Sequence, residues 1–451
     1  MKIDIHTHIL PSSWPEMEGV ELRLRQTGES DGSAIMEWKD GTFFRKVKRN
    51  CFDGAKIVEE CDIAGVDVQV LCTVPVMFNY HLKPEVARPW ARYLNDDLAR
   101  TVSQFPRRFV GLGTLPMQDP AEAVKELRRC VTELGFRGFQ IASHINAYDA
   151  ERDCVKDLML SDAAYLPLWE AAAELGVGFL VHPWDMKWCD KKYWLPWLVG
   201  MTAETCLAVC SVMLSGILDK VPNLKFMFSH SGGAFPATIG RIEWGYKTRP
   251  DLVAVDSKKS PREYMASKAI YLDSICHDPK QLEYLVDLCG ADRIAMGSDY
   301  PFPLGEVPSV APLTHEVIAA YPGEMVENAS FLSAQSKQQI LSGTAVDFLG
   351  LDPAAFDRHT PLTTVTREQA IRQNLDGVFD HAAATRPCGD APPAVAAGGS
   401  VGTDTSEDAE AAEAAKRKLA GNGDGNDDGN ANDAAISGRP HSPSAKRLRQ
   451  R

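Results

Sequence analysis

Eight short apolar runs, separated by helical patterns, constrain the fold of this chain more than any other feature of its sequence. They are rich in Val, Ile and Phe, and they cover residues 2–8, 66–74, 109–115, 138–144, 176–182, 224–230, 269–275 and 293–299. Amphipathic stretches such as 120–134 and 167–175 lie between them. Continuous apolar strands that alternate with helices are typical of a parallel sheet buried on both faces.

Eight strand–helix units predict an α/β fold of the (β/α)8 TIM-barrel type over residues 1–356. A doubly wound open sheet is the alternative, but the GxGxxG turn that often follows the first strand of that fold is absent. An insertion of about residues 12–50 follows the first strand. Within it, residues 34–48 predict a small β-hairpin, because Asp40-Gly41 favours a tight turn between antiparallel strands.

The composition changes near residue 356. No aromatic residue follows Phe379, and residues 383–451 consist mainly of Ala, Gly, Asp, Asn, Ser and Pro. Such a segment cannot bury enough apolar surface to offset its chain entropy, so we expect a disordered, low-complexity tail. Residues 357–382 form the connection to it, and a short helix is expected there over 366–381.

Charge and cysteine content narrow the possible classes of protein. The net charge of −13 argues against a protein that binds nucleic acid by neutralising phosphates. No window holds 18 uninterrupted apolar residues, so no membrane helix is expected, and the first residues do not resemble a secretory signal. The eleven cysteines form no CxxC pair, which favours free thiols in a reducing cytoplasm.

Residues that bind metal ions stand at the ends of four apolar runs. The first run ends in His6-x-His8, the fifth in His182, the sixth in His230 and the eighth in Asp299. Residues i and i+2 of a strand point to the same face, so His6 and His8 lie side by side. The C-terminal ends of barrel strands carry the chemistry of such folds, and imidazoles with a carboxylate suit Zn²⁺ or a similar ion. The sequence therefore predicts a metal site at the mouth of the barrel.

This order of residues resembles the amidohydrolase superfamily of metal-dependent barrels. The fourth run ends in FQIASH and lacks the lysine that bridges two metals in binuclear members, so the resemblance implies a single metal. The segments MKIDIHTHILP, FPRRFVGLGTLPMQ, HSGGAFPATIGRI and GSDYPFPLGE are similar to the 2-amino-3-carboxymuconate 6-semialdehyde decarboxylase family within that superfamily. The similarity extends from Met1 to about Phe356, with Ser231 where that family usually has glycine.

The resemblance implies different roles for the residues at the strand ends. His6, His8, His182 and Asp299 would bind one Zn²⁺ per subunit, with water completing the site and no organic cofactor. His230 would stand beside the metal as general base and acid, and Asp299 would assist it. An imidazole suits this role because its pKa lies near neutral pH.

The substrate implied by the resemblance is a small semialdehyde with two carboxylates. Arginine binds carboxylates through paired N–H bonds, and Arg45 and Arg249 match substrate-binding positions of the family. Arg249 would act across the interface of a homodimer. Lys39 matches a position near the substrate, and Trp197 matches an aromatic wall of the pocket. Weaker candidates for the pocket are Met186, Trp194 and Phe302.

The implied reaction is non-oxidative decarboxylation to 2-aminomuconate 6-semialdehyde. It belongs to the kynurenine pathway of tryptophan catabolism and diverts flux from quinolinate and NAD synthesis. Three alternatives stay open: decarboxylation of an aromatic acid, zinc-dependent hydrolysis of a lactone or amide, and a catalytically silent barrel that displays its tail to partners. Fe²⁺ or Co²⁺ would also fit the same ligands.

Overall fold

The computed structural model describes residues 1–149, 152, 154–307 and 321–358. The chain divides into two units, Met1–Pro393 and Ala394–Arg451, and all described residues belong to the first. The predicted helix at 366–381 and the predicted tail at 383–451 lie outside the described residues.

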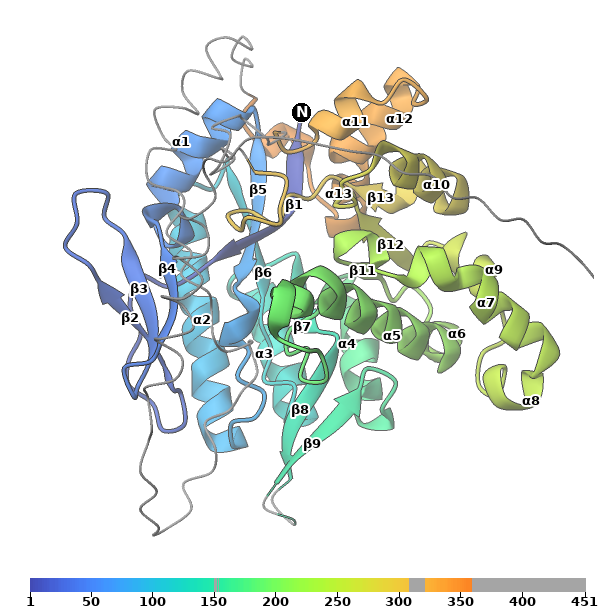
Figure 1. Cartoon of the computed structure of the whole chain (residues 1–451), viewed down its shortest axis with the longest axis horizontal. Coiled ribbons are helices and arrows are strands. Elements are labelled where there is room, and N and C mark those ends of the chain that lie inside the picture. Colours follow the sequence, from blue (N-terminus) through green and yellow to red (C-terminus); the bar gives the residue numbers. More distant parts are fainter. Residues whose placement is uncertain (150–151, 153, 308–320, 359–451) are drawn as a thin grey trace, which may run out of the picture. The chain divides into compact units, whose positions relative to one another are not determined.

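Eight parallel strands form one sheet in the order β1-β5-β6-β7-β10-β11-β12-β13 (Figure 1). The strands are β1 (Ile3–Ile9), β5 (Val68–Thr73), β6 (Phe109–Gly113), β7 (Gly138–Ala142), β10 (Gly178–His182), β11 (Phe226–Phe228), β12 (Ile270–Asp273) and β13 (Ile294–Ala295). The first strand bonds to the segment that begins at β13, because Ile5 N donates to Met296 O (2.9 Å) and His8 N donates to Tyr300 O (2.7 Å). The predicted barrel is confirmed, and the open-sheet alternative is wrong.

The two faces of the strands bury separate cores. Inside the barrel, Ile3, Val68, Val110 and Met227 belong to one cluster, which also contains Phe348 of α13 (Thr344–Leu349). Outside it, Trp169 packs edge-on against Phe179 and Phe226, at ring distances of 4.9 and 5.3 Å. Burial on both faces explains why these strands lack polar alternation.

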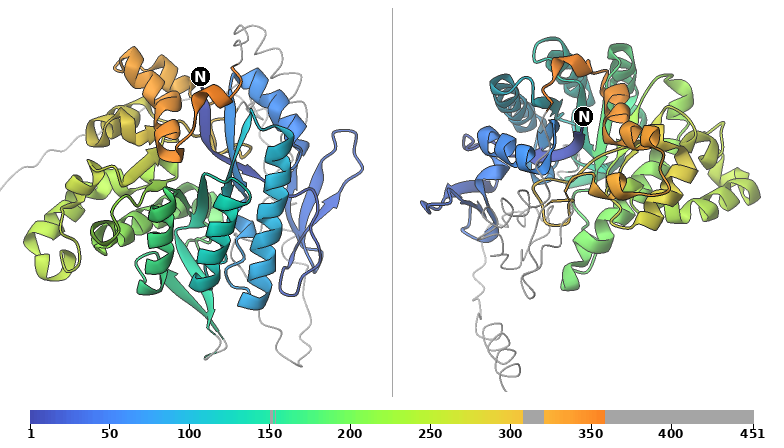
Figure 2. Two further views of the ribbon diagram at one scale, coloured as in Figure 1. Left: turned by 180° about the vertical axis from the view of Figure 1, so that it is seen from behind. Right: turned by 90° about the horizontal axis from the view of Figure 1, so that it is seen from above.

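Helices surround the strands (Figure 2). The longer ones are α1 (Gly54–Ala64), α2 (Pro84–Gln104), α3 (Pro120–Thr132), α4 (Leu166–Leu175), α5 (Met201–Leu214), α7 (Phe235–Thr248) and α10 (Pro279–Cys289). The short ones are α6 (Ile217–Lys220), α8 (Pro250–Val253), α9 (Pro261–Met265), α11 (Glu324–Asn328) and α12 (Ala334–Gln338). Asp53, Asp119 and Asp278 cap α1, α3 and α10 by accepting backbone N–H groups of the first turn. The helices predicted at 120–134 and 167–175 are α3 and α4.

Two small antiparallel sheets decorate the barrel. The predicted hairpin is β3 (Ala34–Trp38) with β4 (Phe43–Val47), and Gly41 in its turn has φ of 85°. The sequence did not predict its third strand, β2 (Leu22–Gln26), nor the hairpin of β8 (His144–Asp149) and β9 (Cys154–Met159). In β9 most side chains are exposed, so it lacks the apolar pattern by which strands are recognised.

One helical stretch in the described part of the chain, Lys192–Leu214, is long and apolar enough to cross a membrane by length and composition alone, with a mean hydropathy of 1.6. Of that window, 39% is buried in this structure. A core helix of a soluble protein passes the same test, so a single stretch of this kind is weak evidence for a membrane span. Its Trp197, Met201 and Thr202 line the pocket described below.

Candidate metal centre and active site

A bulge in β1 turns His6 and His8 towards the barrel axis. Ile3 and Ile5 belong to the interior core, so strict alternation would point the even-numbered histidines outward. The register with β5 shifts between Asp4 and Thr7, and His8 then lies opposite Cys72, another interior residue. Such bulges often re-aim side chains beside active sites. The sequence predicted that the two histidines share a face, but it carried no signal for the bulge.

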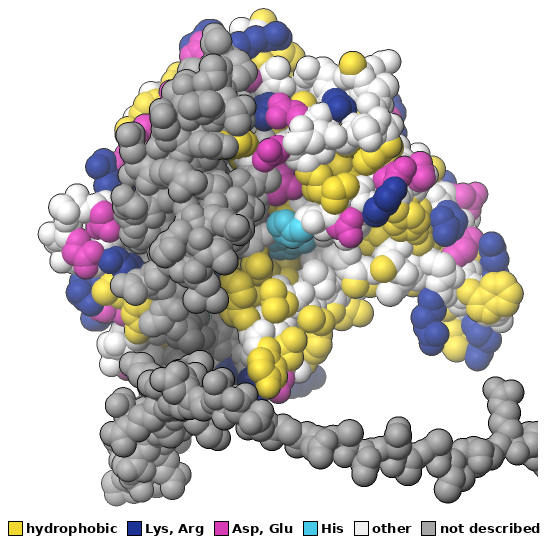
Figure 3. Space-filling model, turned by 45° about the horizontal axis from the view of Figure 1, so that its top comes forward, with side chains coloured by type: hydrophobic (Ala, Val, Ile, Leu, Met, Phe, Trp, Pro, Cys, Tyr) yellow, Lys and Arg dark blue, Asp and Glu magenta, His cyan; other side chains and the backbone are white. Residues whose placement is uncertain are grey.

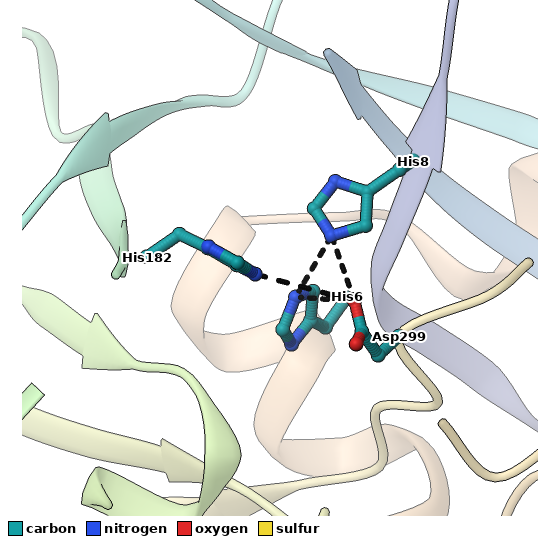
Figure 4. Close-up of side chains that lie close together, drawn as sticks. All are labelled: His6, His8, His182 and Asp299. Carbon is teal, nitrogen blue, oxygen red and sulfur yellow. Dashed lines mark hydrogen bonds and ion pairs between the residues drawn. The ribbon is translucent and has the colours of Figure 1, made fainter. Parts of the chain in front are cut away.

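Four of the five residues predicted at the strand ends converge on one point (Figure 4). Their ligand atoms all lie within 4.8 Å of one another, and all four residues are buried: His6, His8, His182 and Asp299. His8 Nε2 lies 3.2 Å from His6 Nε2 and 2.9 Å from Asp299 Oδ1. His182 Nε2 lies 4.0 Å from Asp299 Oδ1. Ligands in a tetrahedral zinc site are about 3.4 Å apart, given bonds of about 2.1 Å, so these spacings fit a single ion.

The hydrogen bonds of Nδ1, the nitrogen that points away from the cluster in each imidazole, determine that Nε2 faces the middle of the cluster. His182 Nδ1 donates to Pro183 O (2.5 Å) and His8 Nδ1 donates to Thr73 O (3.2 Å), because a carbonyl oxygen only accepts. His6 Nδ1 lies 2.7 Å from a carboxylate oxygen of Asp273. With the protons on Nδ1, three Nε2 lone pairs and one carboxylate face each other with no donor between them. His182 Nε2 has no hydrogen-bond partner within the described residues. A cation satisfies this arrangement.

Burial and neighbouring charges favour the metal-binding forms of His8, His182 and Asp299. Burial lowers the pKa of His8, and burial together with the nearby imidazoles lowers the pKa of His182 well below its ordinary value. Burial raises the pKa of Asp299, but His230 and His8 outweigh it and hold that pKa well below its usual range. Neutral imidazoles and an ionised carboxylate are the forms that coordinate a divalent ion.

His230 lies beside the four-residue cluster. It follows β11 in a short turn, its ring centre is 5.0 Å from that of His182, and its Nε2 lies 3.7 Å from Asp299 Oδ2. Its Nδ1 is buried and has no hydrogen-bond partner among the described residues. Burial lowers the pKa of His230, but the carboxylate of Asp299 more than compensates and raises it above the ordinary value. This position suits a group that exchanges protons beside a metal centre.

A cavity of about 270 Å³ opens over His8, His182, His230 and Asp299. The other residues that line it are mostly apolar, and they include Met36, Phe44, Val74, Trp184, Trp194, Trp197, Leu198, Met201, Ile275 and Phe302. On one face of the molecule, hydrophobic side chains gather beside a solvent-accessible histidine (Figure 3). A mostly apolar cavity with a few polar groups is typical of a site for a small molecule.

Arg45 of β4 is the one arginine or lysine among the described residues that line the cavity. Its guanidinium carbon lies 4.9 Å from the ring centre of Phe302 and 5.8 Å from that of Phe44. Both rings contact the guanidinium through cation–π interactions, which hold it at the edge of the cavity. The inserted sheet thus places a positively charged side chain at the mouth of the barrel.

Three predicted pocket residues lie elsewhere in this chain. Lys39 donates to Met17 O (3.3 Å) and does not line the described pocket. Arg249 is exposed after α7 and pairs with Asp251 at 2.7 Å. Met186 is buried but is also absent from the described lining. Trp197, Trp194 and Phe302 do line it. The roles of Lys39 and Arg249 stay predictions.

The sequence also missed residues that the fold brings to the site. His277 and Gln281, after β12, line the mouth of the cavity, and Asp273 at the end of β12 contacts His6. A second group, half-buried His144 with buried Asp185 and Glu204, lies outside the pocket lining. His144 Nε2 is 3.2 Å from Asp185 Oδ2, and Glu204 accepts the backbone N–H of Trp184 (3.1 Å). This group holds the loop after β10 by its own hydrogen bonds.

Comparisons with known proteins agree with this geometry. The amidohydrolase family model matches residues 3–351. The chain is 43% identical over 360 residues to a 2-amino-3-carboxymuconate-6-semialdehyde decarboxylase of Dictyostelium discoideum, covering 78% of this chain and 92% of that protein. It is 37% identical over 396 residues to the protein of the same name from Caenorhabditis elegans, covering 78% and 94%.

A solved structure shares the fold at lower identity. It is a dihydroxybenzoic acid decarboxylase from Polaromonas sp. JS666 with bound manganese and the inhibitor 2-nitroresorcinol. The TM-score is 0.59 at 24% identity, and the match covers 78% of this chain and 97% of that one.

Proposed function

The chain belongs to the amidohydrolase family, and from that premise we propose that it is a zinc-dependent carboxy-lyase acting on 2-amino-3-carboxymuconate 6-semialdehyde. The observation that carries the proposal is the set of three Nε2 atoms and one carboxylate that face each other beside His230, below a cavity lined by Arg45. The product is 2-aminomuconate 6-semialdehyde. In the kynurenine pathway this reaction diverts the substrate from quinolinate and NAD synthesis.

His6, His8, His182 and Asp299 would hold the ion. A divalent ion there would supply Lewis-acid chemistry and lower the pKa of bound water towards neutrality. Zn²⁺ fits a set of three imidazoles and one carboxylate, and water would be a fifth ligand, a coordination number that zinc can also adopt. The related fold that holds manganese makes Mn²⁺ the second metal to test.

Arg45 would orient the substrate. Its planar guanidinium forms two parallel hydrogen bonds with a carboxylate, whereas the aromatic side chains of Trp197 and Phe302 cover the flat conjugated chain. The carboxylate that leaves would then lie towards His230 and Asp299. The apolar lining excludes water from the rest of the cavity and strengthens these electrostatic contacts.

His230 would move the protons. Replacing a carboxylate by hydrogen consumes one proton and releases one CO₂, so a group at the reacting carbon must deliver that proton. His230 lies in the cavity lining, 3.7 Å from Asp299, and is the described residue best placed to take a proton from water and return it to carbon. Asp299 would both bind the ion and stabilise the charged imidazole.

The assay follows the ultraviolet absorbance of the conjugated substrate. The purified, zinc-loaded protein is expected to bleach this band without forming quinolinate, whereas substrate alone cyclises to quinolinate. An unchanged band with a full complement of zinc would contradict the proposal. Consumption of 2,6-dihydroxybenzoate instead would favour the aromatic-acid alternative, and release of an acid from lactones or amides would favour the hydrolase.

We also propose that the protein works as a homodimer in the cytoplasm. Large apolar side chains are exposed on the pocket wall and on α5, α7 and the segment after them: Leu198, Val199, Leu207, Trp244, Leu252 and Val255. Arg249 lies on the same segment, which suits an arginine that enters the pocket of a neighbouring subunit. The ten cysteines of the described residues are all free, as expected in a reducing compartment.

A further inference from the structure

Asp273 stands between the candidate metal cluster and the turn that carries His230. It ends β12, is fully buried, and accepts four N–H groups. Oδ2 lies 2.7 Å from His6 Nδ1 and accepts His230 N at 2.9 Å. Oδ1 accepts Ser231 N at 2.7 Å and Ile275 N at 3.1 Å. Both oxygens of the carboxylate are therefore occupied by donors, two from the turn, one from a candidate metal ligand and one from its own loop.

The turn that Asp273 binds is conformationally unusual. Four consecutive residues, His230 to Gly233, have φ between 52° and 76°, the left-handed region that non-glycine residues seldom adopt. Two of them, His230 and Ser231, carry side chains, so the surrounding structure must hold them there. The Ser231 hydroxyl adds a bond to Asp273 O (3.2 Å). The backbone N–H groups of both residues point at the carboxylate.

The same carboxylate fixes the tautomer of His6. Accepting a hydrogen bond from Nδ1 keeps the proton on that atom, and the Nε2 lone pair then faces His8 and Asp299. In Figure 4 one nitrogen of the His6 ring faces these residues and the other points away. Nδ1 of His8 and Nδ1 of His182 contact backbone carbonyl oxygens, so among the three histidines His6 is the one whose Nδ1 contacts a carboxylate.

We propose that Asp273 is a positioning residue that sets two parts of the active site at once, the tautomer of His6 and the aim of His230. It does not line the described cavity, so it acts through these two histidines and not on the substrate. The proposal rests on the metal-dependent reaction proposed above. An asparagine in its place cannot satisfy all four donors, because its amide nitrogen would face either the pair from His6 and His230 or the pair from Ser231 and Ile275.

The test uses the full-length protein loaded with Co²⁺, whose paramagnetism shifts the N–H protons of bound imidazoles in ¹H NMR. The wild type is expected to show three exchangeable shifted signals, with the one from His6 among the slowest to exchange. Asp273→Asn is expected to bind Co²⁺ about 10–100-fold more weakly. One of its three N–H signals should disappear or exchange faster with solvent. Its kcat should decrease while its KM changes little. Asp67→Asn is the matched control: this buried carboxylate accepts Lys2 N at 2.7 Å beside the start of β5. It should keep wild-type affinity and all three signals.

Each outcome decides the proposal. Wild-type Co²⁺ affinity in Asp273→Asn, or only two exchangeable signals in the wild type, overturns it. Even if Asp273→Asn fails to fold, the wild-type spectrum still shows whether Nδ1 of His6 carries a proton. A wild type that binds Co²⁺ with three signals but does not decarboxylate contradicts the proposed reaction and leaves the role of Asp273 supported. A wild type that takes up no Co²⁺ overturns the metal centre and this inference with it.

Discussion

At the scale of single residues, the candidate site is defined by which atom each side chain presents. In each of the three imidazoles Nδ1 contacts a hydrogen-bond acceptor and Nε2 faces a common point. Asp299 directs a carboxylate oxygen to the same point. His230 contacts the same carboxylate from the side. We therefore expect two kinds of variant: loss of a proposed ligand should abolish metal binding, and loss of His230 should abolish proton transfer.

His182→Ala is expected to abolish stoichiometric metal binding. The imidazole is one of the four proposed ligands, and its removal leaves two imidazoles and one carboxylate to hold the ion. Metal content by atomic absorption after dialysis measures this directly. His81→Ala is the control, because His81 is a half-buried histidine outside the cluster and the pocket lining. Equal metal content in the two variants would show that His182 is not a ligand.

His230→Ala is expected to fold and to retain metal, but to lose turnover by about 10²–10⁴-fold, the usual contribution of a general acid or base. Its side chain contacts Asp299 but is not part of the four-residue group. The measurement combines metal content with kcat on the same sample. A decrease of only a few-fold would show that another group moves the proton.

At the scale of elements, the geometry of the candidate site depends on irregularities within a strand and directly after one. The bulge in β1 aims His6 and His8, and the left-handed turn after β11 aims His230. Ideal strands would leave these side chains pointing elsewhere. The glycines of the turn, Gly232 and Gly233, adopt the positive φ that this conformation requires.

Gly233→Ala tests the turn. A Cβ there would lie 2.3 Å from Thr202 O, at a φ of 59°, so we expect a loss of about 1–3 kcal/mol in unfolding free energy together with lower activity. Gly240→Ala is the matched control within α7: nothing lies within 4 Å of its Cβ, and alanine should stabilise the helix by about 0.5–1 kcal/mol. Urea unfolding measures both. Similar stability of the two variants would mean that the turn is not constrained as described.

The sequence predicted the elements well and their local irregularities poorly. Each of the eight apolar runs overlaps a barrel strand, because burial on both faces leaves a strong hydrophobic signal. The histidines and Asp299 could be placed because they end those runs. The bulge and the contacts of Asp273 left no such signal, since they depend on pairing between segments far apart in the sequence. The β8–β9 hairpin left none because most side chains of β9 are exposed. Lys39 matched a family position, but in this structure it bonds to Met17.

At the scale of the whole molecule, the described residues contain a candidate site with ligands, base and one arginine, but not a second arginine in the pocket. Arg249 is exposed and pairs with Asp251. A second subunit would supply it if the apolar surface on α5 and α7 forms the dimer interface. The domain limits of 1–356 for catalysis and 383–451 for the tail stay predictions.

Mixing Arg249→Ala with His182→Ala is expected to restore activity that neither variant has alone. In a hybrid dimer the subunit with intact metal ligands would receive Arg249 from its partner. Random exchange would give about a quarter of wild-type activity, because half the dimers are hybrids with one complete site each. No recovery, in samples shown to have exchanged subunits, would place Arg249 outside the site.

Deletion of residues 383–451 is expected to leave kcat and KM close to those of the full chain. Every residue proposed for binding or chemistry lies between His6 and Phe302. Steady-state kinetics of the truncated and full-length proteins, compared at equal metal content, measures the effect. A large loss of activity would show that the tail contributes to catalysis, which contradicts this prediction.

The central claim is that one divalent ion is held by His6, His8, His182 and Asp299, with His230 alongside and not bound to it. Anomalous diffraction at the zinc edge, from crystals of the zinc-loaded protein, tests it most directly. The account predicts one peak per subunit within bonding distance, about 2.0–2.2 Å, of those four side chains and beyond it from His230. A peak elsewhere, a second peak in the same site, or bonding by His230 would contradict it.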